Sequence, residues 1–177
     1  MKEKWSIPKL IRLASQYDSV LDIGCGSGSV IKRIRAKHRI GIDACEKAIS
    51  HANHGNNGVV FMVGDLLRLP NLISDKMDCV IGIDIIEHFE KEDAYQLIFD
   101  CEDIADMCLM FFIPVGLHPQ TKDDRGFDND YYQTHRSSWY PEDMEELGYT
   151  VHYFPNWHKN PAPGKEKGAM WCLKRLV

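Results

Sequence analysis

Three closely spaced glycines near the start of the chain give the main chain an unusual freedom to hold a ligand. Gly24, Gly26 and Gly28 follow Asp22, and residues 19–23 are apolar enough to form a short buried strand. Glycine has no Cβ, so it can adopt positive φ and lets a ligand approach the backbone closely. In an open α/β sheet, ligands bind outside the carboxyl ends of the strands, where this turn would lie. The stretch therefore predicts a site for a nucleotide-like cofactor.

Two more carboxylates follow later predicted strands. Asp43 ends residues 39–43, and Asp65 comes directly after residues 59–63 and Gly64. A carboxylate at the end of the second strand can accept hydrogen bonds from both hydroxyls of a ribose, but it can also cap the helix that follows. Because the glycine turn accompanies Asp43, we favour the ribose. Asp65 alone would be an ordinary loop residue.

Groups that could transfer a proton follow the predicted fourth strand. Asp84, Glu87 and His88 come directly after residues 77–83, and His135 lies in a later segment without regular pattern. An unperturbed imidazole titrates near pH 6.5, so it can act as a general base near neutral pH. We expect His88 and His135 to be the catalytic residues. The alternative is that both are packing groups beneath the cofactor.

Alternating strands and helices would hold these residues in place. Strands are expected at 19–23, 39–43, 59–63, 77–83, 108–113, 149–154 and 169–176. Helices are expected from residue 7 and at about 28–38, 45–53, 90–108 and 141–147. Such alternation implies right-handed βαβ units and a parallel sheet, so the fold class is α/β. The basic residues of 30–42 and the acidic residues of 84–106 are expected on solvated helix faces. Residues 114–140 and 155–168 are expected to be long loops.

Length, charge and cysteine content limit the classes of protein. The chain has 177 residues and a net charge of −5, which suits one domain and argues against a general nucleic-acid binder. It shows no secretory signal and no apolar run long enough to span a bilayer, so no membrane partner is expected. None of the six cysteines forms a C-x-x-C pair, and we expect reduced core residues in a cytoplasmic protein.

The pattern Asp-x-Gly-x-Gly-x-Gly after an apolar strand resembles motif I of class I S-adenosylmethionine (SAM)-dependent methyltransferases. The later carboxylates stand at matching places, so the resemblance covers roughly residues 19–150. It implies a Rossmann-like seven-stranded sheet of order 3-2-1-4-5-7-6, with strand 7 antiparallel and helices on both faces. It also implies one methyltransferase domain over 1–177, with an N-terminal helix (1–18), a SAM-binding half (19–113), and acceptor-side loops with the last strands (114–177).

The resemblance assigns cofactor contacts to residues at the ends of the strands. They are Asp22, Gly24, Cys25, Gly26, Gly28, Asp43, Ala44, Gly64, Asp65, Leu66 and Asp84. In the family, the position of Asp43 holds the ribose, that of Ala44 lies against the adenine, and that of Asp65 accepts from the adenine amino group. Asp22 would face the methionine end of SAM.

The segment from Asp84 to His88 is similar to the Glu-x-x-Glu-His segment of O-methyltransferases of small-RNA 2′-O methylation and quinone biosynthesis. There it helps to bind a divalent cation, and His135-x-x-x-Trp139 resembles the place where the small-RNA enzymes supply another histidine. Here the first acid is Asp, and a hard cation such as Mg²⁺ prefers oxygen ligands. We therefore name no metal ligand. A Mg²⁺ site is a less favoured alternative to a general-base or substrate-orienting role for His88 or His135.

The expected function is methyl transfer from SAM to a small-molecule acceptor, such as a sugar or another hydroxyl-bearing molecule. Acceptor specificity would come from aromatic residues outside the SAM-binding half: Trp5, Tyr131, Tyr132, Trp139, Tyr140 and Trp157. One alternative is a SAM-binding regulatory module without catalysis. Another is an NAD-dependent oxidoreductase, because Gly24-x-Gly26-x-x-Ser29 is one glycine short of the dinucleotide fingerprint. Gly28 and Asp65 argue against the oxidoreductase.

Overall fold

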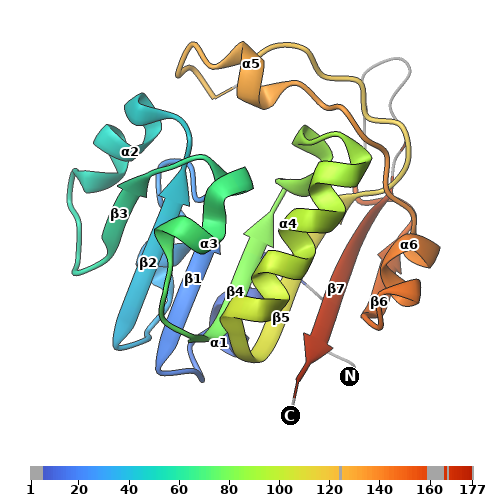
Figure 1. Cartoon of the computed structure of the whole chain (residues 1–177). Coiled ribbons are helices and arrows are strands. Elements are labelled where there is room, and N and C mark those ends of the chain that lie inside the picture. The colour runs from blue at the N-terminus through green and yellow to red at the C-terminus, as the bar shows by residue number, and fades with distance from the viewer. Residues whose placement is uncertain (1–5, 124, 159–165, 167, 177) are drawn as a thin grey trace.

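A seven-stranded sheet in the order β3-β2-β1-β4-β5-β7-β6 forms the centre of the molecule (Figure 1). The computed structural model describes residues 6–123, 125–158, 166 and 168–176, so Trp5 and Asp124 lie outside the described residues. The strands are β1 (Ser19–Ile23), β2 (His38–Asp43), β3 (Val60–Val63), β4 (Met77–Ile83), β5 (Ala105–Pro114), β6 (Thr150–Phe154) and β7 (Ala169–Arg175). β1 to β5 pair in parallel, and β7 pairs antiparallel with both β5 and β6. The predicted strand order and the antiparallel seventh strand are confirmed.

Helices and short 3-10 turns connect the strands and cover both faces of the sheet. The helices are α1 (Ile7–Ala14), α2 (Glu46–Asn53), α3 (Leu69–Leu72), α4 (Lys91–Ile104), α5 (Asp130–Gln133) and α6 (Pro141–Glu146), and the 3-10 turns are η1 (Ile31–Arg33), η2 (Leu66–Arg68) and η3 (Ile86–His88). Figure 1 shows α3 and α4 in front of the sheet and α1 behind it. Within the described residues, no helix is both long enough and apolar enough to cross a lipid bilayer.

Consecutive residues of the central strands contribute to two separate cores. Val20 packs on one face with Leu10 of α1, whereas Leu21 packs on the other face with Leu97 of α4. All four side chains are fully buried. Successive side chains of a strand point to opposite faces, so a strand covered on both sides reads as a continuous apolar run. All six cysteines are free thiols and buried, as predicted.

The predicted helix over 28–38 is wrong, because only η1 forms there. Ile34 is already extended, with φ −75° and ψ 137°. Ile34 and Ala36 are buried while Arg35 is exposed, which is the two-residue period of an extended segment. The guanidinium of Arg39 donates to the Ile34 carbonyl at 3.1 Å and to the backbone carbonyl of a later turn at 2.6 Å. The basic residues here therefore flank an extended segment instead of covering a helix face.

The predicted helix over 90–108 also ends early, at Ile104, and β5 begins at the next residue. Ala105 and Cys108 had extended the apolar repeat of the helix, yet both belong to β5 and both are buried. The change of conformation is immediate, since Ala105 has φ −73° and ψ 134°. An apolar residue at this junction would be buried in the helix and in the strand alike, so its type does not show where the helix ends and the strand begins. Only the boundary was misplaced, because both elements exist.

Candidate functional site

A cavity of about 1010 Å³ lies at the carboxyl ends of the parallel strands. Figure 1 shows the segment that carries α5 passing over this edge of the sheet. The cavity is lined by eleven of the residues predicted from sequence: Asp22, Gly24, Cys25, Gly26, Asp43, Ala44, Asp65, Leu66, Asp84, His88 and His135. Gly28 and Gly64 are not among its lining residues. The fold therefore brings most of the predicted cofactor contacts to one place, together with both predicted catalytic histidines.

The glycine turn between β1 and η1 has a backbone that favours glycine. Gly24, Gly26 and Gly28 have φ of 67°, 53° and 74°. A Cβ on Gly28 would lie 2.6 Å from the ring of Phe61, so the turn packs closely against β3 on that side. A Cβ on Gly26 would meet nothing within 4 Å, and Gly26 lines the cavity. The turn therefore leaves open space beside the main chain where a ligand can approach.

The Asp43 carboxylate joins this turn to the start of α2. Its Oδ2 accepts a hydrogen bond from the Gly26 amide at 2.8 Å, and its Oδ1 accepts one from the Cys45 amide at 2.8 Å. The N-cap position of α2 is occupied by Cys45, not by Asp43. Burial raises the pKa of the Asp43 carboxyl, although these two hydrogen bonds act in the opposite direction. Each oxygen keeps a lone pair for a further donor.

Two other predicted carboxylates differ in their surroundings. Asp22 is only 3% exposed, and burial together with the nearby Asp43 raises the pKa of its carboxyl to about 8. Asp65 is exposed, and its Oδ1 accepts a hydrogen bond from the Leu67 amide at 3.0 Å, which caps η2. Both line the cavity. An opposite charge favours the ionised form of a carboxyl, so a cationic ligand beside Asp22 would ionise it near neutral pH.

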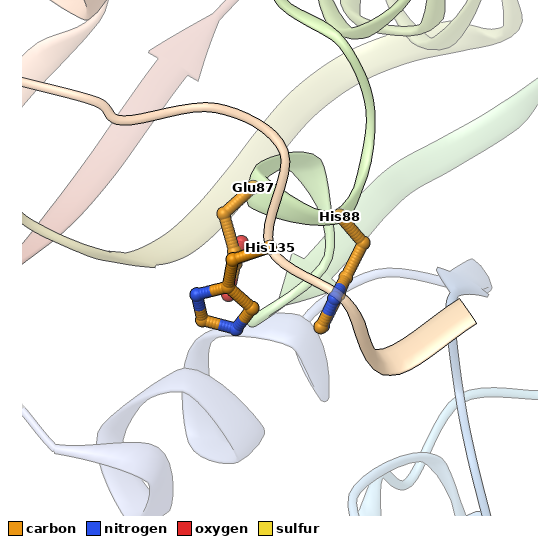
Figure 2. Close-up of side chains that lie close together, drawn as sticks. All are labelled: Glu87, His88 and His135. Carbon is orange, nitrogen blue, oxygen red and sulfur yellow. The ribbon is translucent and has the colours of Figure 1, made fainter. Parts of the chain in front are cut away.

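Glu87, His88 and His135 form a compact cluster in the lining of the cavity. Each offers one ligand atom, and these atoms all lie within 4.8 Å of one another. Figure 2 shows Glu87 and His88 coming from the turn after β4, with His135 reaching them from the later segment. The two imidazole ring centroids are 4.7 Å apart, with the rings nearly perpendicular at 81°. Just before the cluster, Asp84 has φ 49°, a left-handed conformation that is uncommon for a residue with a Cβ.

The main chain holds the two halves of this cluster together. The Glu87 carbonyl accepts hydrogen bonds from the amides of Arg136 at 2.8 Å and Ser137 at 3.2 Å. The Arg136 guanidinium donates to the carbonyls of His88 at 2.7 Å, Thr134 at 3.0 Å and Tyr131 at 2.7 Å. The segment around His135 is thus fixed against η3 by bonds that do not involve the His135 side chain.

Burial sets the electrostatics of the cluster. Glu87 is 2% exposed, and neither of its carboxylate oxygens has a hydrogen-bond partner in the described part of the chain. Burial, followed by the charge of Asp84, raises the pKa of the Glu87 carboxyl well above its usual range. Burial also lowers the pKa of His88, whose Nδ1 lies 3.4 Å from the Thr134 carbonyl. His88 is therefore a neutral imidazole at neutral pH.

Several cavity residues were not predicted as site residues. Arg125 lines the cavity, and its positive charge opposes the rise in pKa that burial causes at Asp43 and Glu87. Asp123 lies in the long loop expected over 114–140, and its carboxylate accepts hydrogen bonds from the amides of Arg125, Phe127 and Asn129 at 2.5–3.2 Å. It therefore shapes the loop that presents Arg125. No motif in the sequence marks either residue.

Histidines from the two long loops also meet at the cavity. His118 is 7% exposed and lines the cavity. His158, which was not predicted, lines it too, and the two ring centroids are 5.0 Å apart. These positions lie far apart in the sequence, so only the fold reveals the pair.

The aromatic residues considered for acceptor binding fall into two groups. Tyr131 and Tyr132 are exposed and line the cavity. Trp139 is fully buried, with the ammonium of Lys91 3.7 Å from its ring centroid. Trp157 packs on the apolar core behind the sheet. Of the aromatic residues in this set that the structure describes, only Tyr131 and Tyr132 line the cavity.

Comparison with known proteins shows which sequences this chain is similar to. Residues 20–105 match the family model described as "Methyltransferase domain". The chain is 36% identical over 74 residues to "Probable tRNA methyltransferase 9B" from Mus musculus, an alignment that covers 42% of this chain and 16% of that protein. The chain thus matches only about a sixth of the length of this curated relative.

Two crystal structures share the fold over nearly the whole chain. Magnesium protoporphyrin IX methyltransferase from Synechocystis PCC 6803, with bound SAH, superposes with a TM-score of 0.66 at 17% identity, covering 97% of this chain and 81% of that one. TehB from Haemophilus influenzae superposes with a TM-score of 0.69 at 14% identity, covering 96% of this chain and 60% of that one. At this level of identity the likeness shows the fold.

Proposed function

We propose that this chain is a class I SAM-dependent methyltransferase and that it transfers a methyl group from SAM to a small hydroxyl-bearing acceptor in the cavity described above. The observation that carries the proposal is that one cavity joins the glycine turn and Asp43 to the cluster of Glu87, His88 and His135. In this proposal, residues 1–177 act as a single domain. Residues 19–113 bind SAM, and residues 114–177 supply the acceptor side.

The residues of the predicted cofactor site fit SAM. The open space at Gly26 gives a ligand direct access to the main chain. Asp43 holds the turn in place and retains lone pairs for the two ribose hydroxyls. Buried Asp22 provides a carboxylate that a cation would ionise, which suits the positively charged methionine end of SAM. Asp65 and Leu66 also line the cavity and would hold the adenine.

The chain's own residues align and activate the acceptor. When bound, SAM supplies a methyl group on a positively charged sulfur, which is intrinsically electrophilic. The segment over the strand ends excludes water and positions the acceptor, and such alignment supplies much of the rate enhancement. A hydroxyl must lose its proton as it attacks, and the neutral imidazole of His88 is available to take that proton at neutral pH. His135, facing His88, orients the same hydroxyl.

A divalent cation offers a second way to activate the hydroxyl, and the residues present fit one. Glu87 is a buried carboxylate without a hydrogen-bond partner among the described residues, and two imidazoles lie beside it. Glu87, His88 and His135 would hold the ion. It would act as a Lewis acid on the acceptor oxygen. Activity that is lost with a chelator and restored by added cation would favour this route over a free histidine base.

The charge of the cavity favours a small acceptor over a nucleic acid. Its lining includes eight acidic residues but only two arginines: Asp22, Asp43, Asp65, Asp84, Glu87, Glu90, Asp93 and Asp123 against Arg125 and Arg136. A polyanion is usually bound by a basic surface. The relative named as a tRNA methyltransferase is matched over 42% of this chain, so its name alone does not assign an acceptor here.

Two measurements test the proposal. SAM and its demethylated product should raise the melting temperature, because a ligand that binds only the native state stabilises it, whereas NAD should leave it unchanged. Incubation with SAM and a panel of small hydroxyl-bearing compounds should then give a product heavier by one methyl group. A shift with NAD and none with SAM would overturn the cofactor assignment. Tight SAM binding without methyl transfer to any compound would favour the regulatory module.

A further inference from the structure

We propose that Phe127 is a further cofactor-binding residue and that residues 125–133, the strap that carries it, close over bound SAM. The inference rests on the proposed function, because it takes the cavity as the SAM site. The strap lies outside residues 19–113, to which the resemblance assigns SAM binding. The cofactor site would therefore be completed by the other half of the chain.

Hydrogen bonds give the strap a defined shape and tie one end of it to the turn after β4. The Asp123 carboxylate accepts hydrogen bonds from three amides of the strap at 2.5–3.2 Å. At the other end, the Arg136 guanidinium donates to the carbonyls of Tyr131 and His88, each at 2.7 Å. Because His88 belongs to η3 and lines the cavity, this end of the strap is attached directly to the cavity wall.

The middle of the strap lies against α2, the helix that follows β2. Nζ of Lys47 is 2.6 Å from Oδ2 of Asp128, and the ring centroids of His51 and Phe127 are 6.0 Å apart. The strap belongs to the loop after β5, and β1 and β4 lie between β5 and β2 in the sheet. The strap therefore crosses the ends of the central strands, as the segment that carries α5 does in Figure 1.

Phe127 lines the cavity beside the residues that the proposed function gives to the nucleoside. Asp43, Ala44 and Ala48 line the same cavity at the end of β2 and in the first turn of α2. Ala48 and His51, the contact of Phe127, are three residues apart on α2 and so lie on one side of that helix. Aromatic side chains stack on nucleobases through their ring faces. The Phe127 ring would therefore cover the adenine or the ribose of bound SAM.

The contact between the strap and α2 is weak enough to open and close. The side chains of Lys47 and Asp128 are 64% and 85% exposed, and exposed ion pairs contribute little and are screened by salt. Bound cofactor would add its own contact with Phe127, so occupancy of the site would favour the closed strap. Tyr131 and Tyr132 lie on the same strap and line the cavity, so closure would also fix their position.

Calorimetric titration with SAH, the demethylated product of SAM, tests the contact of Phe127. Phe127→Ala should weaken SAH binding by about 5–150-fold, the range for loss of an aromatic ring that stacks on a base. Phe99→Ala is the matched control, because Phe99 is 46% exposed on α4 and does not line the cavity, and it should leave SAH affinity unchanged.

Charge reversal tests the tether to α2. Lys47→Glu and Asp128→Lys should each weaken SAH binding by about 2–5-fold, and the double variant should restore it because the ion pair is rebuilt with its charges exchanged. Lys37→Glu breaks another exposed pair, with Asp18 at 2.7 Å, and should leave SAH affinity unchanged. Equal weakening in the double variant would overturn the tether.

Hydrogen exchange reports closure directly. SAH should slow the exchange of the amides of residues 125–133 in the wild-type protein, and by less in Phe127→Ala. SAH should still raise the melting temperature of Phe127→Ala, which shows that this variant is folded. Wild-type SAH affinity in Phe127→Ala, or strap amides whose exchange is unchanged when SAH binds, would overturn the inference and leave the proposed function standing. Absence of SAH binding by the wild-type protein would overturn both.

Discussion

Replacing Asp43 tests whether one carboxylate both stabilises the glycine turn and binds the cofactor. Asp43→Ala removes the acceptor for two backbone amides, those of Gly26 and Cys45, each bonded at 2.8 Å. Hydrogen bonds to a charged group are worth about 1.5–3 kcal/mol each, so the gross loss is about 3–6 kcal/mol. Burial of the carboxylate, which raises its pKa, offsets part of this. We expect a net loss of about 3 kcal/mol in the free energy of unfolding.

The stability effect is measured on the protein without SAM. For a chain of this size, 1 kcal/mol lowers the melting temperature by about 2–4 °C, so Asp43→Ala should melt about 6–12 °C lower. Asp43→Asn keeps one acceptor oxygen, so its melting temperature should lie between those of the wild-type protein and Asp43→Ala. Asp18→Ala is the matched control, because Asp18 is exposed and its pair with Lys37 at 2.7 Å is a surface ion pair. Such pairs contribute about 0–1 kcal/mol.

The binding effect is measured by calorimetry at a temperature where the variant is folded. If Asp43 also holds the ribose, SAM affinity should fall by a further 1.5–3 kcal/mol, or about 10–150-fold. A lower melting temperature with unchanged affinity would mean that Asp43 only holds the turn. Unchanged stability would refute the reasoning from the two amide hydrogen bonds.

Two further substitutions test the glycine turn and the buried Asp22. Gly28→Ala should lower both the melting temperature and SAM affinity. Gly28 has φ 74°, and the new Cβ would lie 2.6 Å from the ring of Phe61. Gly55→Ala is the control, because Gly55 has φ 62° and a Cβ added there would meet no atom within 4 Å. Its free energy of unfolding should fall only by the backbone strain of about 1–2 kcal/mol. A larger fall would contradict the steric argument. The pKa of the Asp22 carboxyl is raised to about 8 in the folded protein. The contribution of Asp22 to stability is therefore fully present below about pH 4 and is lost as the pH rises through 8. The melting temperature of the SAM-free protein should accordingly fall between about pH 5 and pH 8.5. Over the same range SAM should bind more tightly, and Asp22→Asn should flatten both trends, as melting curves and calorimetry at several pH values will show.

The strands and the glycine turn could be predicted because their signals are local. β1 and β4 have the bounds expected from sequence, since a strand covered on both faces is an apolar run that ends where the polar loop begins. The segment after Gly28 could not be predicted in the same way. Ile31 and Ile34 fit a helical repeat, but Ile34 and Ala36 fit an extended one, and the contact from Arg39 to the Ile34 carbonyl accompanies the extended form.

The cofactor side of the cavity was more predictable than the acceptor side. Asp22, Gly26 and Asp43 each stand next to the end of a strand, so a short motif places them. Arg125 and His158 reach the cavity from long loops, where position depends on contacts between segments distant in the sequence. The hydrogen bonds that fix the His135 segment to Glu87 also join segments that are distant in the sequence.

The place of β7 has a consequence for how the protein folds. β7 lies between β5 and β6, and its residues pair with β5 from Cys108↔Arg175 to Pro114↔Ala169. Such pairing joins residues distant in sequence, and closing long loops slows folding. During synthesis, β5 would emerge well before its partner and present an apolar, unpaired edge, which is a template for aggregation. A nascent chain would therefore depend on chaperones or on rapid completion until β7 inserts, and this step would also close the loop that brings His135 to the cavity.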